Sequence, residues 1–127
     1  MSTKALMPGF RVWLKYGDVV IGEGLYELLE GIGASGSISQ AAARMKMSYR
    51  QAWDKIRRTE KRIGVCLISA KAGGRMGGGT HLTPEGEDLL RRYGRFRSEV
   101  AASVNQSFQK NFHDMSLWGD PPTSAQG

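Results

Sequence analysis

The sequence predicts a mainly α-helical fold with small β elements. Apolar residues recur every three or four positions in four stretches, which is the spacing of helices that cover a core. Only a short turn separates the second stretch from the third, and a glycine-rich segment precedes the fourth. With 127 residues and 40% hydrophobic residues, the chain has the size and composition of one globular domain.

The first element is predicted to be a β-hairpin. The segment FRVWLKYGDVVIG, residues 10–22, has two apolar-rich runs around Gly17 and Asp18. Phe10, Val12 and Leu14 alternate with polar or aromatic neighbours, and Gly-Asp is a two-residue turn signal. A hairpin is marginal alone, so it is expected to pack on the helix that follows.

Three helices are predicted next. Leu25, Leu28, Leu29 and Ile32 mark the first, which a glycine cluster ends. The short second helix, QAAARM, is preceded by Ser37 and Ser39, either of which can cap it. The third runs from the capping-box pair Ser48 and Gln51 to Gly64, giving a helix-turn-helix over about 37–64.

A hairpin and a long helix complete the prediction. VCLIS and THL are candidate strands on either side of the glycine-rich loop, and they form a wing over about 66–82. Thr83, Pro84 and Glu85 then give the order of helix start signals for a helix over about 84–110. The predicted domain covers 9–112, between a flexible N-terminus (1–8) and a disordered tail (113–127).

The third helix has one apolar and one cationic face when its residues are placed at about 100° intervals. Trp53 and Ile56 lie on the apolar stripe, so Trp53 is expected in the core. Glu60 lies on the same stripe, and we expect it either to pair with a neighbouring cation or to lie at the edge of the domain. The opposite face carries Arg50, Gln51, Asp54, Lys55, Arg57, Arg58, Lys61 and Arg62. A solvated face normally mixes both signs of charge, so this one favours a functional role.

Charge along the chain supports that interpretation. The net charge is +6, and residues 39–97 hold 14 Lys/Arg against 5 Asp/Glu, whereas both flanking segments are slightly acidic. Such a block indicates a polyanionic partner, although solvated surface charge is the alternative.

Catalysis and cofactor binding are not predicted. GIGASG (31–36) has dinucleotide-loop spacing but ends one helix and precedes a short one instead of joining a strand to a helix. The loop from Gly73 has Walker A spacing, but Gly79 replaces the phosphate-binding lysine. His81 and His113 are isolated, and Cys66, the single cysteine, is expected to be buried and inert. We therefore predict no catalytic residue, no cofactor and no metal, and a cytoplasmic chain without signal peptide or membrane span.

Two segments together carry a family resemblance. SGSISQAAARMKMSYRQAWDKI (35–56) and GGRMGGGTHLTPEG (73–86) closely resemble the N-terminal DNA-binding domain of ModE-type molybdate-dependent transcription regulators and, more loosely, LysR-type regulators. The resemblance covers most of residues 9–110. It implies a winged helix-turn-helix with an N-terminal β-hairpin, a Gly-rich wing and a long C-terminal dimerisation helix, bound to double-stranded DNA as a sequence-specific regulator.

The resemblance also assigns site residues. Ser39 and Gln40 start the positioning helix, and the recognition helix brings Ser48, Tyr49, Arg50 and Gln51 to the major groove. Arg50 is expected to contact guanine edges and Gln51 adenine edges. The expected phosphate contacts are Lys55, Arg57 and Arg58 of the helix and Lys71 and Arg75 of the wing. A homodimer is implied, and the overlong apolar stripe of the last helix supplies its interface: Leu89, Tyr93, Phe96, Val100, Val104 and Phe108.

Two alternatives stay open. A winged helix can also serve as a protein-interaction module, because a fold alone does not fix function. A nucleoid-associated DNA binder without sequence preference is the other. In full-length ModE-type regulators molybdate binds C-terminal domains, so we assign no molybdate site within these 127 residues.

Overall fold

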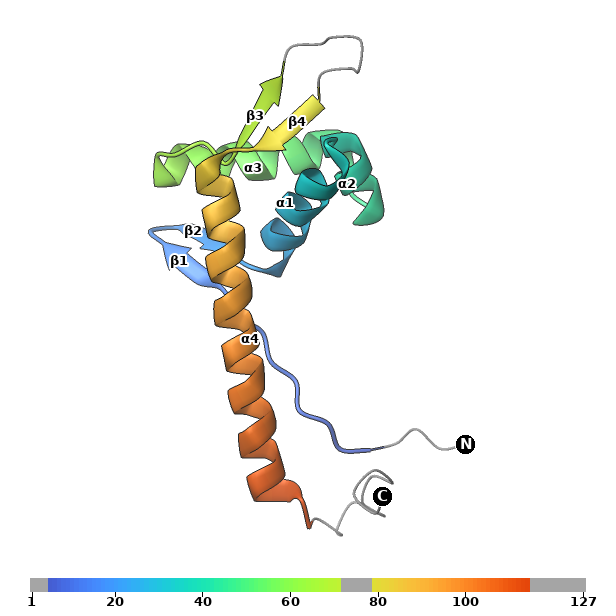
Figure 1. The fold of residues 1–127 in the computed structure, drawn as a ribbon, viewed down its shortest axis with the longest axis vertical. Helices are drawn as coiled ribbons and strands as arrows, with labels where there is room; N and C mark the ends of the chain where they lie inside the picture. Colours follow the sequence, from blue (N-terminus) through green and yellow to red (C-terminus); the bar gives the residue numbers. More distant parts are fainter. Residues whose placement is uncertain (1–4, 72–78, 115–127) are drawn as a thin grey trace. The chain divides into compact units, whose positions relative to one another are not determined.

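The computed structural model describes residues 5–71 and 79–114. Its elements follow the predicted order (Figure 1), and they are β1 (Leu14–Tyr16), β2 (Val19–Ile21), α1 (Glu23–Ser35), α2 (Ile38–Arg44), α3 (Tyr49–Ile63), β3 (Ile68–Lys71), β4 (Gly79–Leu82) and α4 (Pro84–Phe112). The prediction of a mainly helical, winged helix-turn-helix fold is confirmed.

The chain divides into two compact units. Residues 12–95 form one, called the core unit here, and residues 1–11 with 96–127 form the other, called the terminal unit. The division falls inside α4, so about three turns of this helix belong to the core unit. The predicted domain over 9–112 thus takes in the core unit and part of the terminal unit.

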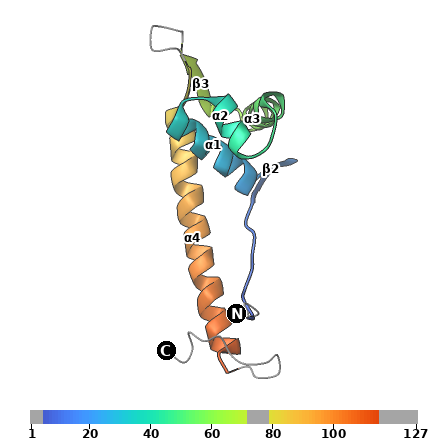
Figure 2. The same cartoon turned by 90° about the vertical axis from the view of Figure 1, so that its right-hand side faces the viewer.

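The hydrophobic core of the core unit lies between its helices. Leu25, Leu28, Leu29 and Ile32 of α1 are buried as predicted, and α2, α3, β2 and β3 pack around them. Figure 2 shows α3 and the first turns of α4 on opposite sides of α1. A face of α3 therefore stays open to solvent.

The N-terminal hairpin is shorter than predicted. Leu14 pairs with Ile21 and Tyr16 with Val19, and Gly17 in the two-residue turn has φ 60°. Pairing stops at Leu14 because β2 ends at Ile21 and the next residue already caps α1, so Phe10 and Val12 have no strand opposite them. The predicted turn is correct, and the predicted start at Phe10 is wrong.

The last helix begins as predicted. The Thr83 hydroxyl accepts the N–H of Gly86 at 3.0 Å and donates to the carbonyl of Cys66 at 2.6 Å. One turn later Asp88 binds Arg91 and Arg92. The hydrogen bond from Arg92 is the main reason why the pKa of Asp88 is lower than usual, and the charges of both arginines add to it.

Tyr93 requires a correction. Its side chain is 1% exposed, its hydroxyl donates to the carbonyl of Val12 at 2.8 Å, and its ring centroid lies 5.0 Å from that of Tyr26. A side chain buried within its own core unit is not available to a second chain. Leu89 is half-buried against the core, and its place in the dimerisation set stays a prediction.

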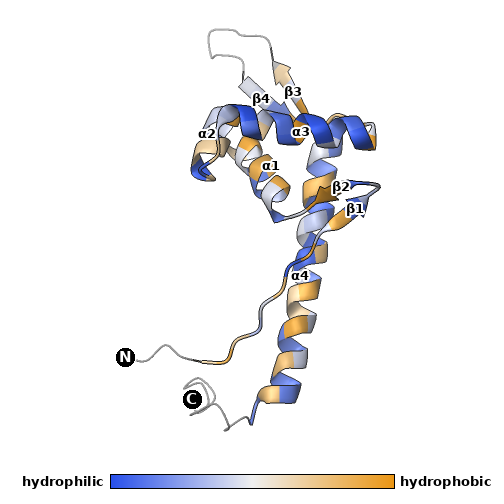
Figure 3. Cartoon of the chain, turned by 180° about the vertical axis from the view of Figure 1, so that it is seen from behind, coloured by the Kyte–Doolittle hydropathy of each residue, from blue (hydrophilic) through white to orange (hydrophobic). Residues whose placement is uncertain are grey.

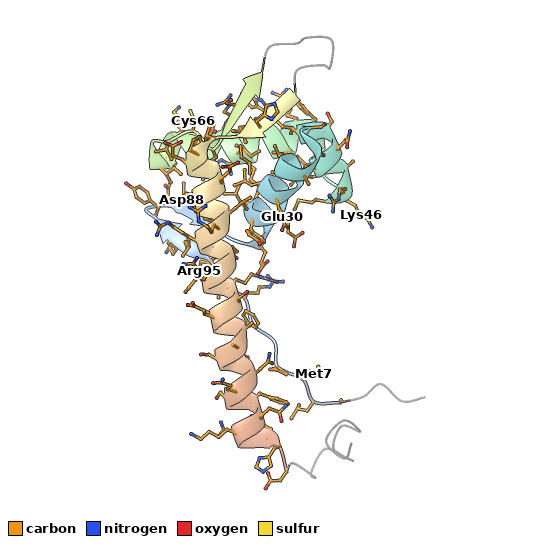
Figure 4. All side chains as sticks on the ribbon, viewed as in Figure 1. Met7, Glu30, Lys46, Cys66, Asp88 and Arg95 are labelled. Carbon is orange, nitrogen blue, oxygen red and sulfur yellow. The ribbon has the colours of Figure 1, made fainter. Side chains whose placement is uncertain are left out.

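The strand of the wing next to α3 also differs from the prediction. It begins at Ile68 instead of Val65, and Cys66, expected to be buried, is exposed (Figure 4). Residues 64–67 instead form the connection that turns the chain from α3 into the wing.

In the described part of the chain, no helix is long and apolar enough to cross a membrane.

Candidate nucleic-acid interface

The helix-turn-helix is built from two capped helices and a tight turn. The Ser37 hydroxyl accepts the N–H of Gln40 at 3.1 Å, so Ser37 and not Ser39 caps α2. The turn that follows contains Lys46 (Figure 4). Its φ is 57°, in the left-handed region. The N–H of Met47 reaches back to the carbonyl of Ala42 at 3.0 Å, which fixes the spacing between α2 and α3.

The start of α3 is held by the predicted capping box. The Ser48 hydroxyl accepts the N–H of Gln51 at 3.0 Å, and the Gln51 Oε1 accepts the N–H of Ser48 at 2.8 Å. Bidentate recognition of adenine needs both the oxygen and the NH₂ of an amide. The Gln51 oxygen already accepts one hydrogen bond in the capping box and has a second lone pair, so the assignment of Gln51 to adenine stays a prediction.

The exposed face of α3 carries most of the predicted contact residues. Figure 3 shows this helix as a mostly hydrophilic ribbon, unlike the mixed colours of α1. Arg50, Arg58 and Lys61 are exposed, and none has an ion-pair partner among the residues that the structure describes. Tyr49, the first residue of the helix, is 53% exposed. The cationic face therefore exists as a surface.

Arg57 differs from these free cations. Its Nη1 lies 2.7 Å from Glu60 Oε1, and its guanidinium carbon lies 4.9 Å from the ring centroid of Trp53. Trp53 is 38% exposed, so the prediction that it belongs to the core is wrong. It lies at the margin of the apolar stripe, where the arginine covers part of its ring. An arginine held by a carboxylate and an aromatic ring is less available to phosphate.

Glu60 now has a structural explanation. It is 6% exposed, and its Oε2 accepts the N–H of Leu67 at 2.7 Å and that of Ile68 at 3.1 Å, while Oε1 binds Arg57. The carboxylate thus connects α3 to the first residues of the wing. The expected pairing with a neighbouring cation is confirmed by Arg57, whereas the two amides could not be predicted because they become free only when the chain turns after Gly64.

The other side of α3 is bounded by the hairpin and by α1. Arg62 Nη1 lies 2.6 Å from both carboxylate oxygens of Asp18, in the β1–β2 turn. Lys55 is half-buried, and a Cβ built on Gly24 of α1 would lie 3.5 Å from its Cε. Of the predicted phosphate contacts on α3, Arg58 is therefore the one that is exposed and has no ion-pair partner among the described residues.

The base of the wing is tied to the end of α1. The N–H of Thr80 donates to the carbonyl of Gly36 at 3.0 Å, and a Cβ on Gly79 would approach that oxygen to 2.7 Å. The absence of a side chain at Gly79 is thus needed for this close approach. Lys71 ends β3, but its side chain and all of Arg75 lie outside the described residues. On α2, Ser39 and Gln40 are both exposed.

The rest of the predicted dimerisation set lies in the terminal unit. Phe96 is 41% exposed, and Val100, Val104 and Phe108 are half-buried. Phe108 stacks on Phe112 with ring centroids 5.5 Å apart, and both line an open apolar groove with Leu6 and Met7. The groove leaves apolar surface uncovered within this unit.

Comparison with known families identifies the helix-turn-helix. Residues 25–87, from α1 to the first turn of α4, match the bacterial regulatory helix-turn-helix proteins of the LysR family. These residues form a LysR-type helix-turn-helix domain. The family is one of bacterial regulatory proteins.

Relatives of this LysR-type domain carry ModE and MopB names. The chain is 40% identical over 86 residues to the molybdenum-pterin-binding protein MopB of Rhodobacter capsulatus, covering 68% of this chain and 32% of MopB. It is 34% identical to the molybdenum transport protein ModE of Azotobacter vinelandii, covering 71% and 38%. It is 41% identical to the DNA-binding transcriptional dual regulator ModE of Escherichia coli K12, and this match covers 52% of this chain and 25% of ModE. The predicted resemblance is confirmed, and the chain spans about a third of the length of these relatives.

Solved structures share the fold of the LysR-type domain. The crystal structure of a CbnR_DBD–DNA complex superposes with a TM-score of 0.54 at 20% identity, covering 66% of this chain and 91% of that one. The crystal structure of VV2_1132, a LysR family transcriptional regulator, gives a TM-score of 0.53 at 19% identity. This match covers 70% of this chain and 29% of that one. At such identities the likeness is one of fold.

Proposed function

We propose that this chain is a sequence-specific DNA-binding transcription regulator that inserts α3 into the major groove. The observation that carries the proposal is the open face of α3, where Arg50, Arg58 and Lys61 are exposed without an ion-pair partner among the described residues. In helix-turn-helix proteins the second helix contacts base edges with its N-terminal residues. A surface of free cations there suits a polyanion.

The position of each residue determines whether it contacts a base or the backbone. Arg50, in the first turn of α3, contacts guanine O6 and N7, for which a guanidinium has matching geometry. Arg58 and Lys61, two and three turns further on, neutralise phosphates of the flanking backbone. The DNA backbone at the N-terminal end of α3 is bound by Tyr49 and by Ser39 and Gln40 of α2. The wing contributes two further phosphate contacts, Lys71 and Arg75.

A homodimer is the second part of the proposal. The exposed Phe96 and the groove around Phe108 in the terminal unit provide an apolar surface for a second copy. Two copies related by a two-fold axis would read two half-sites of a palindromic operator. Such a regulator works where the bacterial chromosome lies, in the cytoplasm.

Duplex binding measured by fluorescence anisotropy tests this function. The first fragments to use are the upstream regions of molybdenum uptake genes, because the relatives are named for molybdenum transport and molybdenum-pterin binding. Log affinity should fall with log salt by about 0.9 per contacted phosphate, and a specific fragment should bind about 10³-fold or more tighter than a scrambled one. The double substitution Arg50→Ala, Arg58→Ala should abolish the difference. Equal affinity for every fragment would instead identify a nucleoid-associated binder.

A protein-interaction module is the second candidate. Trp53, Val65 and Cys66 are exposed together in one open hollow beside the end of α3, and such apolar surface can receive a protein. If the double arginine variant keeps full DNA affinity while Val65→Asp loses a co-purifying protein, this candidate replaces the regulator.

A further inference from the structure

The open face of α3 contains one acidic side chain. Of the two acids in this helix, Glu60 is buried, whereas Asp54 is exposed. Asp54 lies between Arg50, four residues before it, and Arg58, four residues after it. At about 100° per residue its direction falls between those of the two arginines, in the middle of the cationic face.

Asp54 has no partner among the residues that the structure describes. Arginines four positions away on a helix are within reach of a carboxylate. Nevertheless, the ion pairs of α3 closer than 4.0 Å are Arg57 with Glu60 and Arg62 with Asp18. Two acids thus hold cations at the margins of the face, and the acid at its centre holds none. The carboxylate of Asp54 is free to accept a hydrogen bond from a ligand.

The chemistry of the major groove limits what that ligand can be. A carboxylate repels phosphate and the acceptor atoms N7 and O6 of guanine and O4 of thymine. It is attracted only by the amino groups of cytosine N4 and adenine N6. In adenine the acceptor N7 adjoins N6 and would face the second carboxylate oxygen, so cytosine is the better partner.

We propose that Asp54 is a specificity-determining residue that accepts a hydrogen bond from N4 of a cytosine in the operator. This inference rests on the proposed function, because it requires α3 to enter the major groove. Arg50 and Asp54 are separated by about 6 Å along the helix axis, so the two side chains address different base pairs. Asp54 also weakens binding to every other sequence, since it brings a negative charge to the DNA. One residue thereby improves discrimination at the expense of total affinity.

Selection of binding sites from randomised duplexes tests the inference. Wild type should select cytosine at one position, and Asp54→Ala should lose that preference, about tenfold, while retaining the preferences at other positions. Asp54→Asn should shift the preference to adenine, whose N6 and N7 suit an amide. Glu30→Gln is the control, because it changes the net charge equally at an exposed site on α1 (Figure 4). It should leave every base preference unchanged.

Two results would overturn the inference, and they differ in what they imply. If Asp54→Ala binds all duplexes more tightly by one common factor and selects the same bases, Asp54 is a solvated charge and the regulator function stands. If wild type itself selects no sequence, the proposed function fails along with the inference. Matching thermal unfolding of the variants and wild type ensures that binding is compared between folded proteins.

Discussion

Gly86 of α4 lies directly against the carbonyl of Leu67, so closely that a Cβ at position 86 would be 2.2 Å from that oxygen. The contact joins the start of α4 to the start of the wing, because the N–H of Thr83 also donates to the carbonyl of Leu67, at 3.0 Å. A backbone oxygen cannot move aside as a flexible side chain can. The helix and the wing therefore approach each other only because residue 86 has no side chain.

Gly86→Ala should consequently destabilise the protein. The added methyl must displace the wing from α4, which should lower the free energy of unfolding by about 1–3 kcal/mol, the range for overpacked cores. Urea denaturation followed by circular dichroism measures this value. Gly24→Ala is the matched control: its Cβ would meet Lys55 at an ordinary 3.5 Å, so the higher helix propensity of alanine should leave stability equal or improved. Equal unfolding midpoints for Gly86→Ala and wild type would contradict the close contact.

The carboxylate of Glu60 supports a second stability prediction. Glu60→Ala leaves the buried N–H groups of Leu67 and Ile68 without an acceptor, and it frees Arg57. The expected loss is about 3 kcal/mol, because each unsatisfied buried donor costs about 1–3 kcal/mol. Glu60→Gln keeps one acceptor oxygen and should cost less than half as much. The same urea titration compares the two, and equal losses would show that the oxygen atoms do not connect α3 to the wing.

The sequence was sufficient to predict the helices and their order, because caps and apolar spacing are local signals. Ser37, Ser48, Gly36 and Gly64 end or begin helices as those signals predicted. A cation near Glu60 could be expected from the helix alone, but its bonds to the N–H groups of Leu67 and Ile68 could not, since these amides become available only when the chain turns after Gly64. The exposure of Cys66 belongs to the same turn.

The candidate site was predicted less completely than the fold. The cationic face of α3 follows from helical spacing alone, and it is a real surface. Which cations are free does not follow, because Asp18 reaches Arg62 from 44 residues away in the sequence. Tyr93 likewise fits the apolar stripe of α4, but its burial depends on Tyr26 and Val12, which the spacing of the helix does not reveal.

Arg58 and Arg57 should therefore contribute differently to DNA binding. Arg58→Ala should reduce the slope of log affinity against log salt by about 0.9, which corresponds to one phosphate contact. Arg57→Ala should change that slope by less than half as much, because Glu60 and Trp53 already hold the guanidinium. Anisotropy titrations at several salt concentrations give both slopes. If the slopes decrease equally, Arg57 leaves Glu60 when DNA binds.

The ion pair between Asp18 and Arg62 leads to a substitution that should strengthen DNA binding instead of weakening it. Both side chains are more than half exposed, at 66% and 52%, so Asp18→Asn should change the free energy of unfolding by less than about 1 kcal/mol. It should, however, release Arg62 for a phosphate and so increase the affinity at low salt. The slope of log affinity against log salt should become steeper by about 0.9. Glu30→Gln changes the net charge by the same amount without freeing a cation of α3, and its slope should equal that of wild type. A slope for Asp18→Asn that matches this control would show that Arg62 does not reach the duplex.

The last prediction concerns the apolar surface of the terminal unit. Phe108 stacks on Phe112 and lines the groove that also includes Leu6 and Met7. If a second copy covers this surface, Phe108→Glu places a charge in an apolar interface and should convert the dimer to a monomer, since an unpaired buried charge costs several kcal/mol. Sedimentation equilibrium should give twice the chain mass for wild type and the single-chain mass for the variant. Gln109→Glu adds the same charge at the neighbouring exposed position and should remain dimeric. A dimer that survives Phe108→Glu must be formed by another surface of the chain, whereas a monomeric wild type would require each copy to bind its half-site independently.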